Sequence, residues 1–150
     1  MRIDNRKNAT KFKRLFFIVS IIIALVALGL FLLDHTIYAL ACVGVFSLWY
    51  LYFHVADYHF IQYKDENNKV VLRYYKTIRF GKPAYSSIEF SKQLLHKAYF
   101  ENSIFGKLSD VTLEIKTKRG IAEYPSVSLS AVPFEDRKKI EKSLNSILQR

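Results

Sequence analysis

The residues from Leu15 to Val55 form an apolar block that is almost free of charge, and this block constrains the fold more than any other feature. Its 41 residues would make a single helix about 60 Å long at roughly 1.5 Å per residue. The hydrocarbon core of a bilayer is only about 30 Å thick and needs about 20 residues to cross it. The block therefore predicts two membrane-spanning helices, at 15–33 and 37–55, joined by a polar turn at 34–36.

The predicted turn consists of Asp34, His35 and Thr36. Asp34 and Thr36 are both good N-cap residues, so we expect one of them to cap the second helix at the water boundary. An alternative is that Asp34 and His35 handle protons within the membrane, because intramembrane ionisable groups are functional by default. By length alone the two residues lie outside the membrane, and we favour the turn.

Positive charge flanks the apolar block and predicts its orientation. The chain has a formal net charge of +10, because residues 1–14 carry +5, residues 56–150 carry +6 and Asp34 carries −1. By the positive-inside rule both termini should be cytosolic. A signal peptide is a poorer interpretation, because the first span leads into a second one. Cys42 is the only cysteine, so no disulfide can form within the chain, which agrees with a cytosolic domain.

Aromatic residues gather at the end of the second span. Amphipathic rings favour the headgroup level of a bilayer, so we expect a membrane-interface belt here. The belt residues are Trp49, Tyr50, Tyr52, Phe53 and Tyr58. His54 and His59 lie among them, but a spacing of five residues puts the two on different helix faces. Without a nearby cysteine or acidic cluster to complete a metal shell, we expect neither a metal nor another cofactor.

From residue 60 onward the apolar pattern changes from helical spacing to alternation, which is typical of strands. The predicted strands lie at 60–64, 69–77, 86–91, 95–100, 110–117, 121–124 and 126–130. A helix with one apolar stripe follows, formed by Ile140, Leu144, Ile147 and Leu148. Residues 56–150 should therefore form one mainly β domain, an antiparallel barrel or sandwich of about seven short strands capped by a C-terminal α-helix.

The order of two spans, several strands and one closing helix resembles the bacterial pleckstrin-homology-like (PH-like) membrane proteins with an N-terminal two-span hairpin. The resemblance rests on the sequence SSIEFS at 86–91, the loop around Gly106, the strand-turn-strand at 111–124 and the helix at 134–148. It covers residues 58–150 and the hairpin ahead of them. It implies an antiparallel barrel plugged at one end by the helix, and non-catalytic modules associated with a bacterial cytoplasmic membrane.

The sequence contains none of the common catalytic motifs. We find no HExxH, no phosphate-binding loop, no GxSxG and no glycine-rich dinucleotide turn. The four histidines are scattered along the chain, and the adjacent acidic pairs fall in a turn and at a helix start. We therefore expect a protein that is not an enzyme.

Basic residues are the remaining candidates for a binding site. Each Lys or Arg near an anionic leaflet contributes about 1 kcal/mol to binding, although the N-terminal bases could serve only to fix topology. The tentative lipid-binding residues are Arg2, Arg6, Lys7, Lys11, Lys13, Arg14, Lys64, Lys69, Arg73 and Lys76. The phosphoinositide pattern of eukaryotic PH domains is absent. Acids interspersed through the domain, and the lack of an RNP-like motif, argue against nucleic acid as a partner.

Three functions remain open from the sequence. The first is a non-enzymatic interaction module that docks a partner protein at the cytosolic membrane face or acts as an accessory subunit of a membrane complex. The second is a sensor of anionic lipid at the membrane surface. The third is a small transport component formed when several hairpins associate as a homo-oligomer. Against it, the two spans have few polar residues that could line a pore, namely Ser20 and Ser47.

Overall fold

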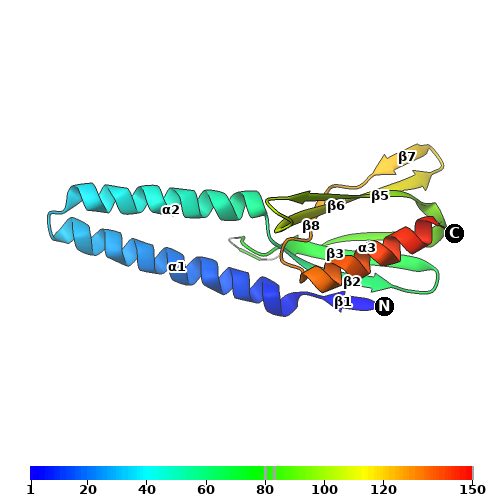
Figure 1. Ribbon diagram of the computed structural model, residues 1–150, viewed down its shortest axis with the longest axis horizontal. Helices are drawn as coiled ribbons and strands as arrows, with labels where there is room; N and C mark the ends of the chain where they lie inside the picture. Colours follow the sequence, from blue (N-terminus) through cyan, green and yellow to red (C-terminus); the bar gives the residue numbers. More distant parts are fainter. Residues whose placement is uncertain (80, 83, 150) are drawn as a thin grey trace.

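A computed structural model of the chain describes residues 1–79, 81–82 and 84–149. Two long antiparallel helices extend from one end of an elongated molecule, and the strands lie at the other end (Figure 1). Helix α1 spans Arg6–Leu32 and helix α2 spans Thr36–Ala56, and both are long and apolar enough to cross a membrane. The two long apolar helices predicted from the sequence are therefore confirmed.

The turn between the helices differs from the prediction. Asp34 has a left-handed φ of 60°, while the amide of His35 donates to the carbonyl of Leu30 and that of Asp34 donates to Phe31. This is the Schellman arrangement that closes a helix C-terminus. Thr36 is already the first residue of α2, whose N-cap position is His35 and has no side-chain cap hydrogen bond. The expected N-cap by Asp34 or Thr36 was wrong, because Asp34 serves the end of α1.

The start of the chain joins the β-domain. Strand β1 (Arg2–Asp4) pairs with β2 (His59–Asp65), and α1 begins at Arg6 rather than at the apolar block. The side chain of Asn5 fastens this junction, because its Nδ2 donates to the His59 carbonyl at 3.0 Å and its Oδ1 accepts from the Ile61 amide at 2.7 Å. The sequence predicted neither the strand nor this start of the helix.

The strands form two antiparallel sheets. In the first, β1 and β2 are followed by β3 (Lys69–Lys76) and β4 (Ser86–Ser91), in the order β1-β2-β3-β4. A single 3-10 turn, η1 (Lys92–Leu94), leads into the second sheet. The second sheet consists of β5 (Leu95–Ser103), β6 (Leu108–Thr117), β7 (Gly120–Glu123) and β8 (Val127–Ser128), with β6 pairing to the other three.

All seven predicted strands are present, and all but β4 have shifted ends. The expected strand at 126–130 is reduced to two residues, and β5 and β6 are longer than predicted, so that only residues 104–107 separate them. Helix α3 (Phe134–Leu148) follows with the predicted bounds. The layout of two helices, antiparallel sheets and a C-terminal helix is thus confirmed, while the PH-like barrel remains a prediction.

Helix α3 contributes its apolar stripe to the core of the β-domain. Ile140 and Leu144 are each 1% exposed and pack with residues of both sheets, and Ile147 is partly buried against them. Leu148 was predicted to belong to this stripe but is 37% exposed, because it lies in the last turn of the helix. Tyr63 on β2 is 1% exposed and holds α3 in place through a hydrogen bond of 2.8 Å with the Ser143 hydroxyl.

Candidate functional site at the junction and on the first sheet

The helices and the β-domain meet in a second buried cluster, which we call the junction cluster. It consists of Phe16 of α1, Phe53 and Ala56 of α2, Tyr58 and Ala131. The rings of Phe16 and Phe53 are tilted against each other with centroids 5.1 Å apart. Phe12 of α1, which packs against the cluster, stacks on Tyr58 with centroids 4.3 Å apart. Aromatic contacts of this kind fix the β-domain to the helices.

The junction cluster buries two of the five residues predicted to form a membrane-interface belt. Tyr50 and Tyr52 are about half exposed and Trp49 is half-buried, and the belt itself stays a prediction. Phe53 and Tyr58 are only 5% and 7% exposed, which the sequence did not predict. Their rings pack on protein rather than facing outward. Burial, together with a hydrogen bond to Tyr52, raises the pKa of Tyr58.

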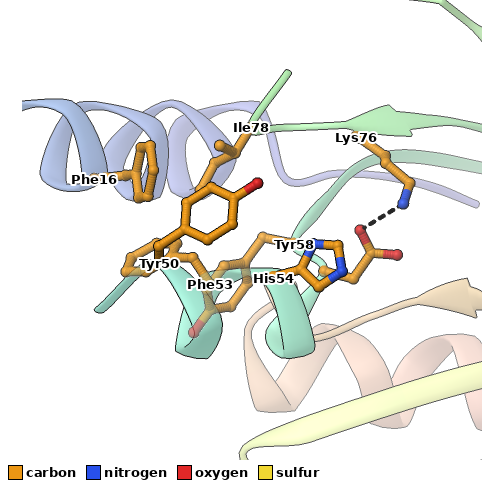
Figure 2. Close-up of a pocket in the computed structure, with 8 residues that line it drawn as sticks. Phe16, Tyr50, Phe53, His54, Tyr58, Lys76 and Ile78 are labelled. Atoms are coloured by element: carbon orange, nitrogen blue, oxygen red, sulfur yellow. Dashed lines mark ion pairs between the residues drawn. The ribbon is translucent and has the colours of Figure 1, made fainter. Parts of the chain in front are cut away.

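A small cavity opens beside the junction cluster (Figure 2). Its volume is about 70 Å³, and the rings of Phe16, Tyr50 and Phe53 form one side of it. On the other side Lys76 forms an ion pair of 3.1 Å with Asp57. Pockets for small-molecule substrates measure about 300–1,000 Å³, so this cavity is too small to be one.

His59 lies next to the junction cluster and has a structural role. It is 4% exposed, and its Nδ1 accepts a hydrogen bond of 3.1 Å from the Ser128 amide, which joins the two sheets. Burial lowers the pKa of His59 despite the nearby Asp57 carboxylate, so the ring is neutral at pH 7. His54 stacks instead on Tyr50. Among the residues that the structure describes, no cluster of His, Cys, Asp or Glu could hold a metal ion.

The structure brings three of the ten predicted basic residues together on the outer face of the first sheet. Arg2 on β1 lies directly opposite Lys64 on β2, and Arg73 on β3 lies in the adjacent row opposite Gln62. Like charges directly opposite each other destabilise a sheet. Within the described part of the chain, no carboxylate lies within 4 Å of these three side chains. We call Arg2, Lys64 and Arg73 the basic triad.

Three other predicted bases already have partners within the chain. Lys69 forms an ion pair of 2.7 Å with Glu89, and the ion pair of Lys76 with Asp57 is part of the junction. The guanidinium of Arg6 lies 5.9 Å from the ring centre of Phe60. These contacts make the three residues poorer candidates for binding a ligand.

The remaining predicted bases are on α1. Lys7, Lys11 and Arg14 lie within a sector of about 60° on the helix, roughly opposite the Phe12 and Phe16 side chains that pack on the domain. We call these three residues the α1 stripe. Lys13 is exposed on a neighbouring face. The ten candidates therefore do not form one site but divide into a sheet group and a helix group.

Sequence reasoning missed two features that bear on function. One is the role of Asn5 in joining β1 to β2, which the sequence does not signal because it shows only a single asparagine before a basic segment. The other is the β5–β6 turn, where the adjacent side chains of Ile104 and Phe105 are exposed. Two large apolar residues before a glycine in an otherwise polar loop were the signal that could have revealed it.

Comparison of the chain with protein-family models, with curated proteins and with solved structures found no match. Function must therefore be inferred from the arrangement of the residues.

Proposed function

We propose that the chain is a membrane-anchored, non-enzymatic interaction module. In this proposal α1 and α2 span a bacterial cytoplasmic membrane with both termini in the cytosol. The PH-like β-domain then docks a partner protein with an acidic surface, either transiently or as an accessory subunit of a membrane complex.

The exposed apolar surface of α1 and α2 supports the membrane anchor. Twenty large apolar or aromatic side chains between Leu15 and Val55 are between 44% and 79% exposed. Soluble monomers rarely expose a contiguous apolar patch larger than a few hundred Å². A bilayer would cover this surface, and the basic residues on both flanks favour the orientation proposed here.

The basic triad is the observation that carries the docking proposal. Its members face outward with no carboxylate within 4 Å in the described part of the chain, although Glu89 lies near Arg73 on the same face. The pairing of Arg2 with Lys64 costs the sheet stability. Lys64 lies five residues beyond His59 along β2, which places it about 17 Å from the junction end of the strand. Charges are screened over about 8 Å at physiological salt, so the triad is too far from the bilayer to bind it. An acidic protein surface is the partner that suits its charge and position.

The junction cluster supports the proposal that the helices hold the β-domain in a fixed position at the membrane. Because β1 continues into α1 through Asn5, and because Phe53 and Tyr58 are buried between helix and domain, the β-domain has two firm attachments to the helices. A domain held in this way offers the basic triad to partners at a fixed distance from the membrane.

Binding of anionic lipid is the second candidate, and the α1 stripe is the observation that favours it. Lys11 and Arg14 lie within about 6 Å of Leu15 along the helix axis. The headgroup layer of a bilayer is about 5–8 Å thick on each side, so these two side chains reach it in a spanning helix. Lys11 and Arg14 would then contribute about 2 kcal/mol of attraction to an anionic leaflet.

Two triple variants with the same loss of charge distinguish the candidates. In the sheet variant, the basic triad carries Arg2→Gln, Lys64→Gln and Arg73→Gln. The helix variant removes the α1 stripe but keeps Arg6 and Lys13 for topology. Each full-length protein is purified from its host membrane into nanodiscs and washed at low and high salt. Proteins and lipids that remain bound are then quantified by mass spectrometry.

We expect a stoichiometric protein with the wild type and the helix variant, and its loss from the sheet variant. A partner retained equally by both variants would contradict docking at the basic triad. If only anionic lipid co-purifies, and only the helix variant loses it, the lipid-sensor function replaces the docking function.

A further inference from the structure

The turn between β5 and β6 carries the most exposed large apolar side chain in the described part of the chain. Phe105 is 103% exposed, and its neighbour Ile104 is 53% exposed. Neither side chain contributes to the core of the β-domain or to the junction cluster. Folding alone therefore does not account for two adjacent apolar residues at this position.

The turn also has an unfavourable backbone that is held in place. Ile104 and Phe105 have left-handed φ angles of 51° and 55°, which cost energy for residues with a Cβ and most of all for a β-branched one. Arg137 of α3 donates from Nη1 to the Gly106 carbonyl at 3.0 Å, and its Nε donates to the Val132 carbonyl at 2.7 Å. The turn is thus fixed to α3 in a form that directs both side chains outward.

The position of the turn places it level with the ends of the apolar helices. Leu108, the first residue of β6, packs against the junction cluster, which contains Phe16 and Phe53. Ser103 pairs with Leu108, and residues 104–107 extend beyond this pair. Figure 1 shows that the β5–β6 hairpin points back toward the helices, with its turn beside the end of α2.

We propose that Ile104 and Phe105 insert into the interfacial layer of the bilayer, next to the point where α2 leaves it. This inference rests on the proposed function, because it requires α1 and α2 to span the membrane. The turn then attaches the β-domain directly to the bilayer, in addition to its two attachments to the helices, and does so by apolar contact.

The surroundings of the turn favour a bilayer over a protein partner. The exposed ring of Phe134, at the start of α3, lies under the Lys138 ammonium at 4.4 Å, and Lys107 is exposed in the turn itself. Apolar side chains next to lysines suit the boundary between acyl chains and phosphates. Glu135 is also at this end, so charge attraction is weak and the contact is mainly apolar.

Tryptophan fluorescence in nanodiscs with brominated acyl chains tests this contact. In a Trp49→Phe background, Phe105→Trp reports on the turn. Leu25→Trp, at an exposed site in the middle of α1, reports on membrane spanning, and Ile121→Trp, at a 60% exposed site on β7, reports on the far end of the β-domain. Nanodiscs of zwitterionic lipid are used, so that electrostatic attraction does not contribute.

We expect brominated lipid to quench the fluorescence of the Phe105→Trp and Leu25→Trp variants several-fold more than that of the Ile121→Trp variant. High salt should leave the quenching of all three variants unchanged. Quenching of Leu25→Trp without quenching of Phe105→Trp overturns the insertion of the turn but leaves the anchor intact. Absence of quenching in Leu25→Trp overturns the anchor itself.

A blue-shifted emission of Phe105→Trp without quenching would mean that protein covers the turn, which also overturns the proposal. Ile104→Trp repeats the test if Phe105→Trp disturbs the fold.

Discussion

Asn5 is the residue through which the β-domain holds the start of α1, and Asn5→Ala tests this role. Asn5 is 3% exposed. Its side chain satisfies both the carbonyl of His59 and the amide of Ile61, at 3.0 and 2.7 Å. Alanine would leave one buried donor and one buried acceptor without a partner. Each such group costs about 1–3 kcal/mol of stability. Because the site can relax in part, we expect Asn5→Ala to destabilise the pairing of β1 by about 2–4 kcal/mol in total.

The measurement is hydrogen exchange of the β1 and β2 amides in full-length protein in nanodiscs. If β1 opens locally, a loss of about 2–4 kcal/mol accelerates exchange by about 30- to 1,000-fold, since about 1.4 kcal/mol is a factor of ten. The effect should reach the Ile3 and Tyr63 amides, which lie opposite each other, and should spare β6.

Asn8→Ala is the matched control, because Asn8 is half-buried on the same helix and its side chain has no hydrogen bond within the described residues. We expect its exchange to match the wild type. An increase of less than about threefold for Asn5→Ala, equivalent to under about 0.7 kcal/mol, would refute the reasoning that these two hydrogen bonds hold β1 in place.

Two further predictions concern the junction. Phe53→Ala should lower the free energy of unfolding by about 3–5 kcal/mol and so lower the thermal midpoint in detergent. Val55→Ala, at a 61% exposed site in the same turn of the helix, should lower this midpoint far less. Similar shifts of the midpoint in the two variants would contradict the packing of Phe53 described above. Because burial lowers the pKa of His59, the unfolded chain binds the proton more tightly, so stability should fall as the pH drops below about 6.5. His59→Gln, which keeps an acceptor for Ser128, should flatten this pH dependence of the thermal midpoint, and an unchanged slope would show that another group titrates.

The elements that sequence predicted best have strong local patterns. The strand at Ser86–Ser91 and the helix at Phe134–Leu148 have the predicted bounds, because alternation defines the first and an apolar stripe with an acidic first turn defines the second. Strand β1 was missed because three residues are too short to show alternation, and their partner, β2, lies more than 50 residues away in the chain.

The candidate site was predicted less well than the fold. Composition revealed the aromatic cluster, but it could not tell exposed rings such as Tyr50 and Tyr52 from Phe53 and Tyr58, which pack between helix and domain. Likewise, the count of basic residues was known from the sequence. Only the pairing register shows that Arg2 faces Lys64, whereas Lys69 is neutralised by Glu89.

The placement of β1 ahead of both helices has a consequence for biogenesis. Strand β1 is synthesised first, but its partner β2 follows only after both apolar helices have left the ribosome. With one helix inserted and the other not, β1 and β2 would lie on opposite sides of the bilayer and could not pair. Once the hairpin has formed, it brings the two strands together and removes most of the entropic cost of closing a loop of more than 50 residues. If α1 and α2 span a membrane as proposed, completion of the first sheet would act as a checkpoint, at which the β-domain matures only on chains with both helices inserted.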